Sequence, residues 1–197
     1  MVLAIAGSAA PPGASAASTV ANLLDPGFGS NGTLPVQSSP ASYKQDPTRE
    51  FVRPDGRIVL VSPGLFLPDL ACVGGSPSET GTRTMIVVLA PDGAVDAGFG
   101  GGDRVVVCGE ARQVIVATDN TLRMSTRAFD SNGVGAAFRA VVMGKDGAVV
   151  STSAPWRYDP ATAPPDVLTP TAAGGLIVET AGSLIRLGSN GRPDPPF

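Results

Sequence analysis

The sequence contains no histidine, few aromatic residues and few charged residues. Without histidine, Ser-His-Asp and Cys-His catalytic arrangements, histidine-ligated metal sites and histidine-based pH switches are all excluded. Aromatic residues make up 5% of the chain and charged residues 16%, whereas 43% are hydrophobic. This apolar fraction is enough to offset the entropy of ordering the chain, which argues against disorder and against a collagen-like structure. We expect a core built mainly from Val, Leu, Ile and Ala.

Long apolar runs and clusters of basic residues are also missing. Pro, Gly, Asp or Arg interrupts every apolar stretch before it reaches the ~20 residues that a membrane-spanning helix needs. The formal net charge is -3, and the Arg and Lys residues are scattered. Such a chain has no electrostatic footprint for nucleic acid or for an anionic membrane surface. We therefore predict no nucleic-acid partner and no insertion into a membrane.

The first 22 residues differ in composition from the rest of the chain. They are small, apolar and uncharged, with a short apolar core at residues 2–6 and an Ala-x-Ala pattern at Ala14 and Ala16. This resembles the end of a secretory signal, although a basic segment before the core is missing. We interpret residues 1–22 as a leader or truncated signal-like segment and residues 23–197 as the folded domain. The leader favours an extracellular or secreted protein, and a cytoplasmic protein with an Ala-rich leader is the alternative.

The sequence has two cysteines, Cys72 and Cys108. In an exported protein such a pair favours a disulfide, which would stabilise the fold by about 3 to 4 kcal/mol in the loop-entropy model. The alternative is two buried free thiols, each acting as a small hydrophobic residue. Because the spacing of two cysteines does not show that their Cβ atoms meet, Cys72 and Cys108 are a disulfide candidate at this point.

Glycine and proline are abundant, with 25 and 19 residues, and many of them fall in turns that recur along the chain. A polar turn followed by a short apolar strand occurs at residues 54–61, 118–125 and 171–178. An apolar strand that enters a turn alternates with it, at residues 85–95, 140–149 and 184–192. Asp-Gly and Asn-Gly pairs are strong hairpin signals, because a type I′ turn requires positive φ at both central residues. The chain has such pairs at Asp55-Gly56, Asp92-Gly93, Asn132-Gly133, Asp146-Gly147 and Asn190-Gly191.

An Asp-x-x-Phe motif separates the units. It begins at Asp25, Asp96 and Asp194 and ends at Phe28, Phe99 and Phe197. Asp25 and Asp194 are 169 positions apart, which gives about 56 residues for each of three units. After Gly147 the motif is replaced by residues 150–153. We expect the Phe to fill the space between consecutive sheets and the Asp to cap the tight turn, both structural roles.

These patterns predict an all-β fold. No segment shows a sustained 3.6-residue apolar period with caps at both ends, as an amphipathic helix would. A unit of about 56 residues with roughly four short strands has the size of one propeller blade. We predict a β-propeller-like array of about three four-stranded blades, open or incomplete, because a closed propeller ordinarily has at least four.

The recurring motifs resemble the delta-60 repeat family, whose units run from an Asp-x-x-Phe-Gly seam through a Pro-Asp-Gly turn to a second Asp-Gly turn. The best matches are residues 24–32, 54–60 and 89–100, and the resemblance covers about residues 23–197. It is weakest in the third unit, where Ala173-Gly174 replaces Asp-Gly. The resemblance implies a propeller-like bacterial surface or secreted repeat without enzymatic activity. The matching positions are turn and packing residues: Asp25, Phe28, Asp55, Gly56, Asp92, Gly93, Asp96, Phe99, Asp146, Gly147, Asp194 and Phe197.

Motifs for catalysis or cofactor binding are lacking. The chain has no Gly-x-Ser-x-Gly elbow, no phosphate-binding P-loop and no dinucleotide-binding Gly-x-Gly-x-x-Gly, so we predict no cofactor. The nearest candidate for a calcium site is residues 130–133, which we interpret as an Asx-type hairpin turn. Carboxylate pairs suited to glycoside hydrolysis remain an alternative, since the chain has 17 acidic residues whose separation in space is open.

A proline-rich loop carries the lone tryptophan, Trp156, followed by Arg157 and Tyr158. Exposed aromatic residues are favoured at recognition sites, where a Trp stacks on a sugar or a peptide. The alternative is a Trp that covers the end of a blade. We expect a non-catalytic, exported module that recognises a protein or a glycan, with a carboxylate-based propeller hydrolase or lyase acting on glycans as the alternative.

Overall fold

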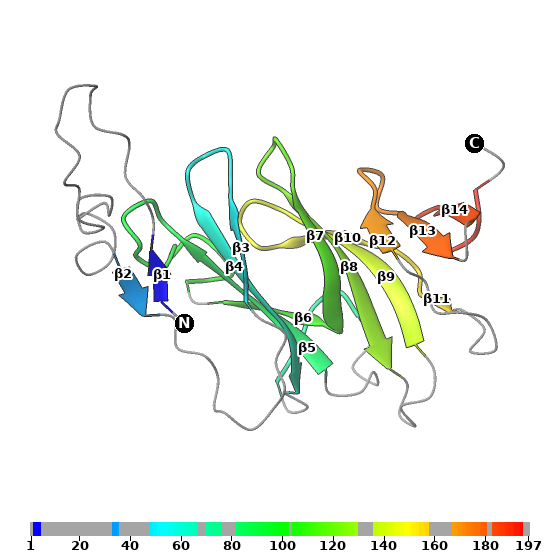
Figure 1. Cartoon of the computed structure of the whole chain (residues 1–197), viewed down its shortest axis with the longest axis horizontal. Coiled ribbons are helices and arrows are strands. Elements are labelled where there is room, and N and C mark those ends of the chain that lie inside the picture. Colours follow the sequence, from blue (N-terminus) through cyan, green and yellow to red (C-terminus); the bar gives the residue numbers. More distant parts are fainter. Residues whose placement is uncertain are drawn as a thin grey trace, which may run out of the picture.

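The computed structural model describes residues 2–4, 33–35, 48–66, 70–75, 82–102, 104–129, 136–157, 167–180 and 183–194. These residues form strands and turns and no helix, which confirms the predicted all-β class. Three antiparallel sheets follow one another in chain order, from left to right in Figure 1, and none of them is closed. A separate two-stranded ladder pairs β1 (Val2–Ala4) with β2 (Thr33–Pro35). A search of the described residues for a helix long and apolar enough to cross a membrane found none.

The first sheet is a four-stranded antiparallel meander with the strand order β3-β4-β5-β6. Its strands are β3 (Arg49–Val52), β4 (Ile58–Phe66), β5 (Thr82–Leu89) and β6 (Val105–Cys108). β-branched residues dominate β5 and β6 and begin β4, as expected for strands in a buried sheet. A register shift between Ser62 and Leu65 interrupts the pairing of β4 with β5.

The second sheet has the order β10-β9-β8-β7, and the short β11 also pairs with β9. Its strands are β7 (Glu110–Val116), β8 (Leu122–Phe129), β9 (Ala136–Met143), β10 (Val149–Thr152) and β11 (Trp156–Arg157). β10 pairs with the Met143 end of β9, and β11 pairs near its Phe138 end. The outer strand of this sheet is therefore interrupted between β10 and β11.

The third sheet has three strands in the order β12-β13-β14. They are β12 (Val167–Pro170), β13 (Leu176–Thr180) and β14 (Ser183–Leu187). A single antiparallel bridge between Leu187 and Pro193 extends the sheet beyond β14.

The three sheets are stacked face to face. One buried cluster lies between the first and second sheets and includes Val59 and Ile86 on one side and Met124 and Val141 on the other. A second cluster joins the second and third sheets, where Phe138 and Ala140 pack with residues of β12, β13 and β14. Successive side chains of a strand point to opposite faces, so β9 supplies residues to both clusters. The second sheet is buried on both sides, which explains its nearly unbroken apolar run at residues 140–143.

The predicted turns close with one repeated pattern of hydrogen bonds. In the turns that precede β4, β8 and β13, an N–H group donates to the carbonyl three residues earlier, at distances of 2.9, 3.0 and 3.1 Å. The turns that follow β5, β9 and β14 have the same bond at 2.9, 3.1 and 3.0 Å. The donor in all six turns lies at positive φ, and these donors are Gly56, Asn120, Gly174, Gly93, Gly147 and Gly191.

The turn type is not the expected type I′. A type I′ turn needs positive φ at both central residues, but among the described non-glycine residues Asn120 alone has positive φ. Asp55, Asp92 and Asp146 therefore lie on the ordinary side of the φ range, and in these turns the following glycine alone is left-handed. This is the three-residue hairpin loop in which a type I turn is followed by a glycine bulge. Asn132-Gly133 and the calcium candidate at residues 130–133 lie outside the described residues.

The Asp-x-x-Phe seam can be followed at Asp96 and Phe99. Phe99 is only 1% exposed and belongs to the buried cluster between the first and second sheets. Asp96 Oδ1 accepts a hydrogen bond from the Gly98 N–H at 3.0 Å. Asp194 occupies the matching position after β14, with its N–H bonded to the Arg186 carbonyl at 2.9 Å. The other seam residues named above, Asp25, Phe28 and Phe197, lie outside the described residues.

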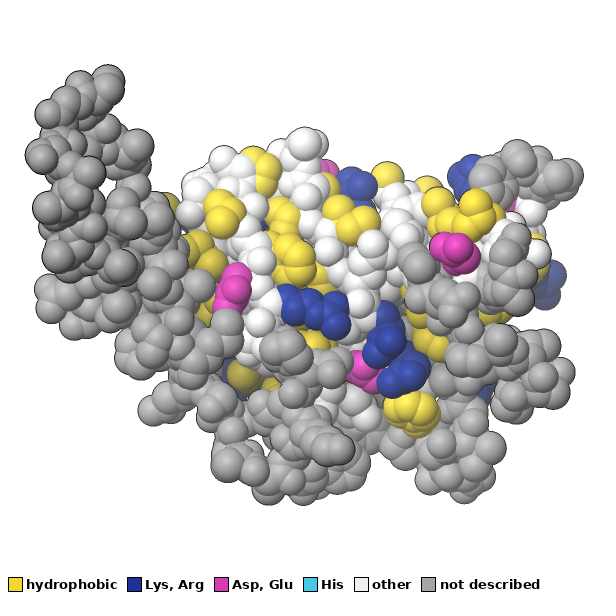
Figure 2. Space-filling model, in the orientation of Figure 1, with side chains coloured by type: hydrophobic (Ala, Val, Ile, Leu, Met, Phe, Trp, Pro, Cys, Tyr) yellow, Lys and Arg dark blue, Asp and Glu magenta, His cyan; other side chains and the backbone are white. Residues whose placement is uncertain are grey.

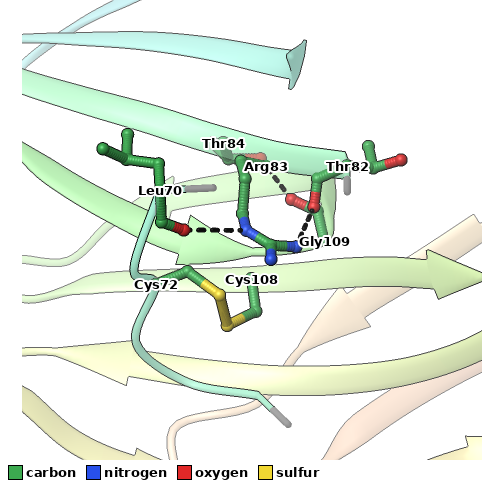
Figure 3. The surroundings of a disulfide bond; sticks show 7 residues. All are labelled: Leu70, Cys72, Thr82, Arg83, Thr84, Cys108 and Gly109. Carbon is green, nitrogen blue, oxygen red and sulfur yellow. Dashed lines mark hydrogen bonds between the residues drawn. A yellow bond between two sulfur atoms is a disulfide. The ribbon is translucent and has the colours of Figure 1, made fainter. Parts of the chain in front are cut away.

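Cys72 and Cys108 form the expected disulfide, with Cα atoms 5.1 Å apart. The disulfide joins residues 70–75 to the edge strand β6. The Val73 N–H donates to Val106, and the Cys108 N–H donates back to Val73, both at 2.9 Å. Beside the disulfide, the Arg83 guanidinium donates to the carbonyls of Leu70 and Thr82 (Figure 3). Segment 70–75 therefore covers part of an edge that would otherwise be open to pairing with other chains.

The chain passes from the first sheet to the second at Gly109. This glycine has φ +90°, and a Cβ atom there would lie 2.8 Å from the Arg127 carbonyl oxygen. The buried Thr84 hydroxyl donates to the Gly109 carbonyl and accepts from the Ala111 N–H, each at 2.8 Å. Thr84 thus fixes the short connection that brings β7 against the first sheet (Figure 3).

Candidate functional site

A polar pocket of about 280 Å³ lies where turns of the first two sheets meet. We call it the turn pocket. It is lined by Arg53, Asp55, Arg57, Asp96, Gly98, Asn120, Lys145 and Asp146. These residues come from four turns, and each turn is one of the hairpin or seam elements that recur along the chain.

Arg53 connects the first sheet to a turn of the second. Its side chain runs from the end of β3 and the residue is only 3% exposed. One terminal nitrogen donates to the Lys145 carbonyl at 3.0 Å, and the other lies 3.2 Å from Asp55 Oδ2. The Nε–H group of Arg53 is buried and has no hydrogen-bond partner in the described part of the chain. A buried, unpartnered donor is costly, so this nitrogen marks a position where an acceptor would be stabilising.

Asp55 and Arg57 belong to an ion-pair network. Arg57 lies 3.0 Å from Asp55 Oδ2 through one nitrogen and 2.8 Å from Asp96 Oδ2 through Nε. The charge of Asp96, together with the hydrogen bond and charge of Asp55, raises the pKa of Arg57 above its ordinary value. The Asp55 N–H donates to Asn120 Oδ1 at 3.2 Å. Turns of the first and second sheets are thus held at a fixed separation by charged and polar contacts.

Lys145 and Asp146 complete the turn pocket from the turn between β9 and β10. Asp146 Oδ1 accepts from the Ala148 N–H at 3.1 Å, and the Asp146 carbonyl accepts from Gly100 at 2.8 Å. Within the described chain, the Lys145 ammonium group makes no ion pair or hydrogen bond. The pocket therefore contains charged groups in ion pairs and one charged group, the Lys145 ammonium, without a partner among the described residues.

A second charged cluster lies away from the turn pocket, around Glu110 on β7. Glu110 is 7% exposed, and its two carboxylate oxygens are each 2.6 Å from an arginine, Arg112 and Arg127. Burial by itself would raise the pKa of Glu110, but hydrogen bonds and charges of Arg127 and Arg112 outweigh it and lower that pKa. The Arg127 guanidinium also lies 4.8 Å from the centre of the Phe129 ring. The Glu110 carboxylate is thus paired through both of its oxygens, while the buried Nε–H of Arg127 has no hydrogen-bond partner among the described residues.

Acid catalysis finds little support among the carboxylates with a perturbed pKa. A general acid at neutral pH needs a raised carboxyl pKa. Hydrogen bonds from the Thr121 side chain and backbone lower the pKa of Asp119, and Glu110 is shifted in the same direction. In the part of the chain that is described, no group of three or more Asp, Glu or Cys residues could hold a metal ion.

The predicted recognition loop begins at β11. Trp156 is partly buried, packs against the cluster between the second and third sheets, and has its ring centre 5.8 Å from that of Phe138. Arg157 is exposed, and Tyr158 lies outside the described residues. Trp156 is not among the residues that line the turn pocket.

Charged side chains are unevenly distributed over the surface (Figure 2). On the face shown in Figure 2, basic side chains gather near the middle with an acidic side chain against them, and much of the surrounding surface is neutral or apolar.

Sequence reasoning named Asp55, Asp96 and Asp146 as turn residues but missed the basic residues beside them. Arg53, Arg57 and Lys145 each lie within two residues of a turn aspartate. This neighbourhood was the available signal, since opposite charges close in sequence form short ion pairs. The closeness of these charges in sequence does not predict that the three turns meet in the folded chain.

Comparisons with protein-family models, with curated proteins and with solved structures found no match to this chain, so the delta-60 resemblance remains a prediction from its motifs.

Proposed function

We propose that the protein is a non-catalytic, exported recognition module, built as a β-propeller-like array of repeats, that binds a protein or a glycan. The observation that carries this proposal is the turn pocket, in which turns of two sheets present fixed charged and polar side chains around a cavity. Recognition sites of this kind consist of a preformed hollow with a few polar groups held in place.

The repeat arrangement is supported by the equivalent pairing within the sheets. The last hairpin strand of the first sheet, β5, is bridged by Val95 and then paired by β6. β9 is paired in the same way by β10 and then β11, and the seam position at residues 150–153 overlaps β10. Antiparallel sheets of this size that pack face to face in chain order are the building principle of propellers.

Export is supported by the disulfide together with the leader-like composition of residues 1–22. Disulfides persist in oxidising compartments and are rare in the reducing cytosol. An exported, disulfide-bonded array whose turns carry the polar contacts is suited to binding in an extracellular medium.

The alternative function, a glycan-active hydrolase or lyase, needs a carboxylic acid that stays protonated. Asp55 and Asp96 in the turn pocket are instead held in ion pairs with arginines. These ion pairs occupy both carboxylates with contacts inside the protein, which favours binding over acid catalysis.

The test is to incubate the purified chain with a panel of soluble oligosaccharides and peptides, and to measure binding by calorimetry and new reducing ends or unsaturated products in the same samples. We expect binding without product formation. Product that accumulates in proportion to protein concentration, and that is absent from an Asp55→Asn sample, would overturn the non-catalytic proposal in favour of the hydrolase or lyase.

A further inference from the structure

We propose that the turn pocket is a carbohydrate site that binds one neutral sugar unit through its hydroxyl groups. This deepens the proposed function, on which it rests, by assigning the site and the ligand class. The inference uses the groups of the pocket that have no partner among the residues that the structure describes.

Three hydrogen-bond donors of the turn pocket make neither a hydrogen bond nor an ion pair with a described residue. The Nε–H of Arg53 is buried without a partner, and the Lys145 ammonium group has none within the described residues. The amide of Asn120 accepts from Asp55 through its oxygen, while its NH₂ group donates to no described residue. All three residues line the same cavity, and a ligand with several acceptors would satisfy the Lys145 and Asn120 donors together beside the buried Arg53 side chain.

One acceptor of the pocket, the second carboxylate oxygen of Asp146, also has no hydrogen-bond donor among the described residues. Asp146 uses Oδ1 to accept from the Ala148 N–H, and no described residue donates to its second oxygen. Asp55 and Asp96, by contrast, are occupied by Arg53, Arg57 and backbone N–H groups. A ligand that complements this site therefore needs hydrogen-bond acceptors and at least one donor. Hydroxyl groups provide both, because each has one O–H donor and two lone pairs.

The charge of the pocket favours a neutral ligand over an anion. Three cations, Arg53, Arg57 and Lys145, face three carboxylates, Asp55, Asp96 and Asp146. The two arginines are paired with Asp55 and Asp96, and Lys145 is adjacent in sequence to Asp146. A phosphate or carboxylate would gain one free ammonium but would approach the Asp146 charge, whereas a sugar hydroxyl donates to that carboxylate.

The pocket is small and partly rigid. Arg53 is almost fully buried, and the Asn120 backbone is held at φ +64° by its hairpin turn, so these two residues lose little freedom when a ligand binds, whereas Lys145 and Asp146 are exposed. A volume of about 280 Å³ corresponds to roughly nine water molecules at ~30 Å³ each. This accommodates one sugar ring and leaves the rest of a glycan outside.

The experiment titrates the full chain with the methyl glycosides of glucose, galactose, mannose and N-acetylglucosamine, followed by calorimetry and by backbone amide NMR shifts. We expect at least one glycoside to bind and to shift the amides of Asp55, Asn120 and Asp146. Lys145→Ala and Asp146→Asn are each expected to weaken its affinity by about tenfold, the effect of one good hydrogen bond to a charged group.

Asp92→Asn is the matched control. Asp92 occupies the same turn position as Asp146 and accepts from the Ala94 N–H at 3.0 Å, but it does not line the pocket. Its substitution is expected to leave the affinity unchanged. A variant that loses binding because it unfolds is recognised by the loss of the dispersed amide spectrum, and Lys145→Gln, which keeps the stem of the side chain, then replaces Lys145→Ala.

Each other outcome overturns the proposal in a distinguishable way. Sugar binding that survives Lys145→Ala and Asp146→Asn but is lost in Arg157→Ala places the site in the loop after β11 and leaves the recognition function standing. Tighter binding of glucuronate or acetate than of every neutral glycoside replaces the sugar hydroxyls by a carboxylate. Release of methanol from the glycosides would overturn the non-catalytic function itself.

Discussion

The two junctions between the stacked sheets are closed by different means. Between the first and second sheets, Phe99 lies inside a large apolar cluster, and segment 70–75 is fixed at the edge by the disulfide. Between the second and third sheets the seam has lost its Asp-x-x-Phe motif, the apolar cluster is smaller, and buried serines take part in the contact. The same turns and the same face-to-face stacking are thus compatible with a hydrophobic plug or with hydrogen-bonded hydroxyl groups.

The serines of the second junction are fully used. The buried Ser125 hydroxyl donates to the Leu168 carbonyl of the third sheet at 2.7 Å and accepts from Gln113 N–H at 3.1 Å. Ser153, in the slot of the missing seam, accepts from the Ala140 N–H at 2.9 Å and donates to the Ala154 carbonyl at 3.0 Å. Because every one of these bonds replaces a bond to water, their net contribution is smaller than that of a buried aromatic ring.

Phe99→Ala should have the largest effect on this comparison. The substitution removes a buried ring and leaves a cavity between two sheets, so we expect a loss of about 3 to 5 kcal/mol in the free energy of unfolding. Urea denaturation followed by circular dichroism measures it. Val95→Ala, at an exposed position nearby, is the control and should change the free energy little. An equally small loss for Phe99→Ala would show that the first junction does not depend on its plug.

Removal of the disulfide should come next. We expect the double variant Cys72→Ala/Cys108→Ala to lose about 2 to 4 kcal/mol, because the unfolded chain is no longer constrained. Amide hydrogen exchange should also become faster at Val73, which donates to Val106 on β6. Reduced wild-type protein should behave like the double variant. Unchanged protection at Val73 would mean that hydrogen bonds alone hold segment 70–75 in place.

The serines of the second junction should give a smaller effect. Ser125→Ala leaves the Gln113 N–H and the Leu168 carbonyl without their partner, and we expect a loss of about 1 to 3 kcal/mol. Ser183→Ala, at an exposed position of β14, should be neutral. The measurement is again the urea midpoint at constant slope. A loss for Ser125→Ala that equals the loss for Phe99→Ala would remove the distinction between the two junctions.

Glu110 should give the smallest effect and should be visible only in acid. Its pKa is lowered in the folded state from the ordinary value of 4.5 by Arg127 and Arg112. The stabilisation is therefore fully present above pH 4.5 and is lost as the pH falls through the lower folded-state pKa. Glu110→Gln should flatten the fall in unfolding free energy below this pH relative to wild type.

The control for this acid titration is Glu179→Gln, which alters an exposed residue of β13. It should keep the wild-type pH profile. If Glu110→Gln and wild type lost stability in parallel from neutral pH to pH 3, the arginine contacts of Glu110 would contribute nothing to the acid response.

Much of the fold followed from local signals in the sequence. Apolar strands bounded by Asp-Gly and Asn-Gly turns indicated an all-β chain, and the turns formed at residues 53–57, 90–94, 144–148 and 188–192. The turn type was wrong because Asp-Gly pairs fit both a type I′ turn and a type I turn followed by a left-handed glycine. At the first turn Pro54 favours the observed type, since its fixed negative φ suits the first central position of a type I turn.

The candidate site was less accessible to sequence reasoning. A lone aromatic residue in a proline-rich loop is typical of a binding surface, but its sequence position does not reveal that Trp156 packs against Phe138. The sequence does not reveal whether Cys72 pairs with Cys108. In the structure, a parallel bridge between Val73 and Val107 places segment 70–75 against β6, and this brings the two cysteines together. Neither burial nor proximity between distant segments is encoded in the spacing of the residues concerned.

The sequence by itself determined the turns, because each depends on neighbours. A side-chain oxygen of Asp55, Asp92 or Asp146 reaches the N–H two residues later, and the following glycine alone adopts positive φ without strain. Only the tertiary structure decided that these turns share a pocket. Arg53 and Lys145 are 92 residues apart, and they meet because burial of the apolar faces of two sheets, a non-directional force, brings the ends of both sheets together.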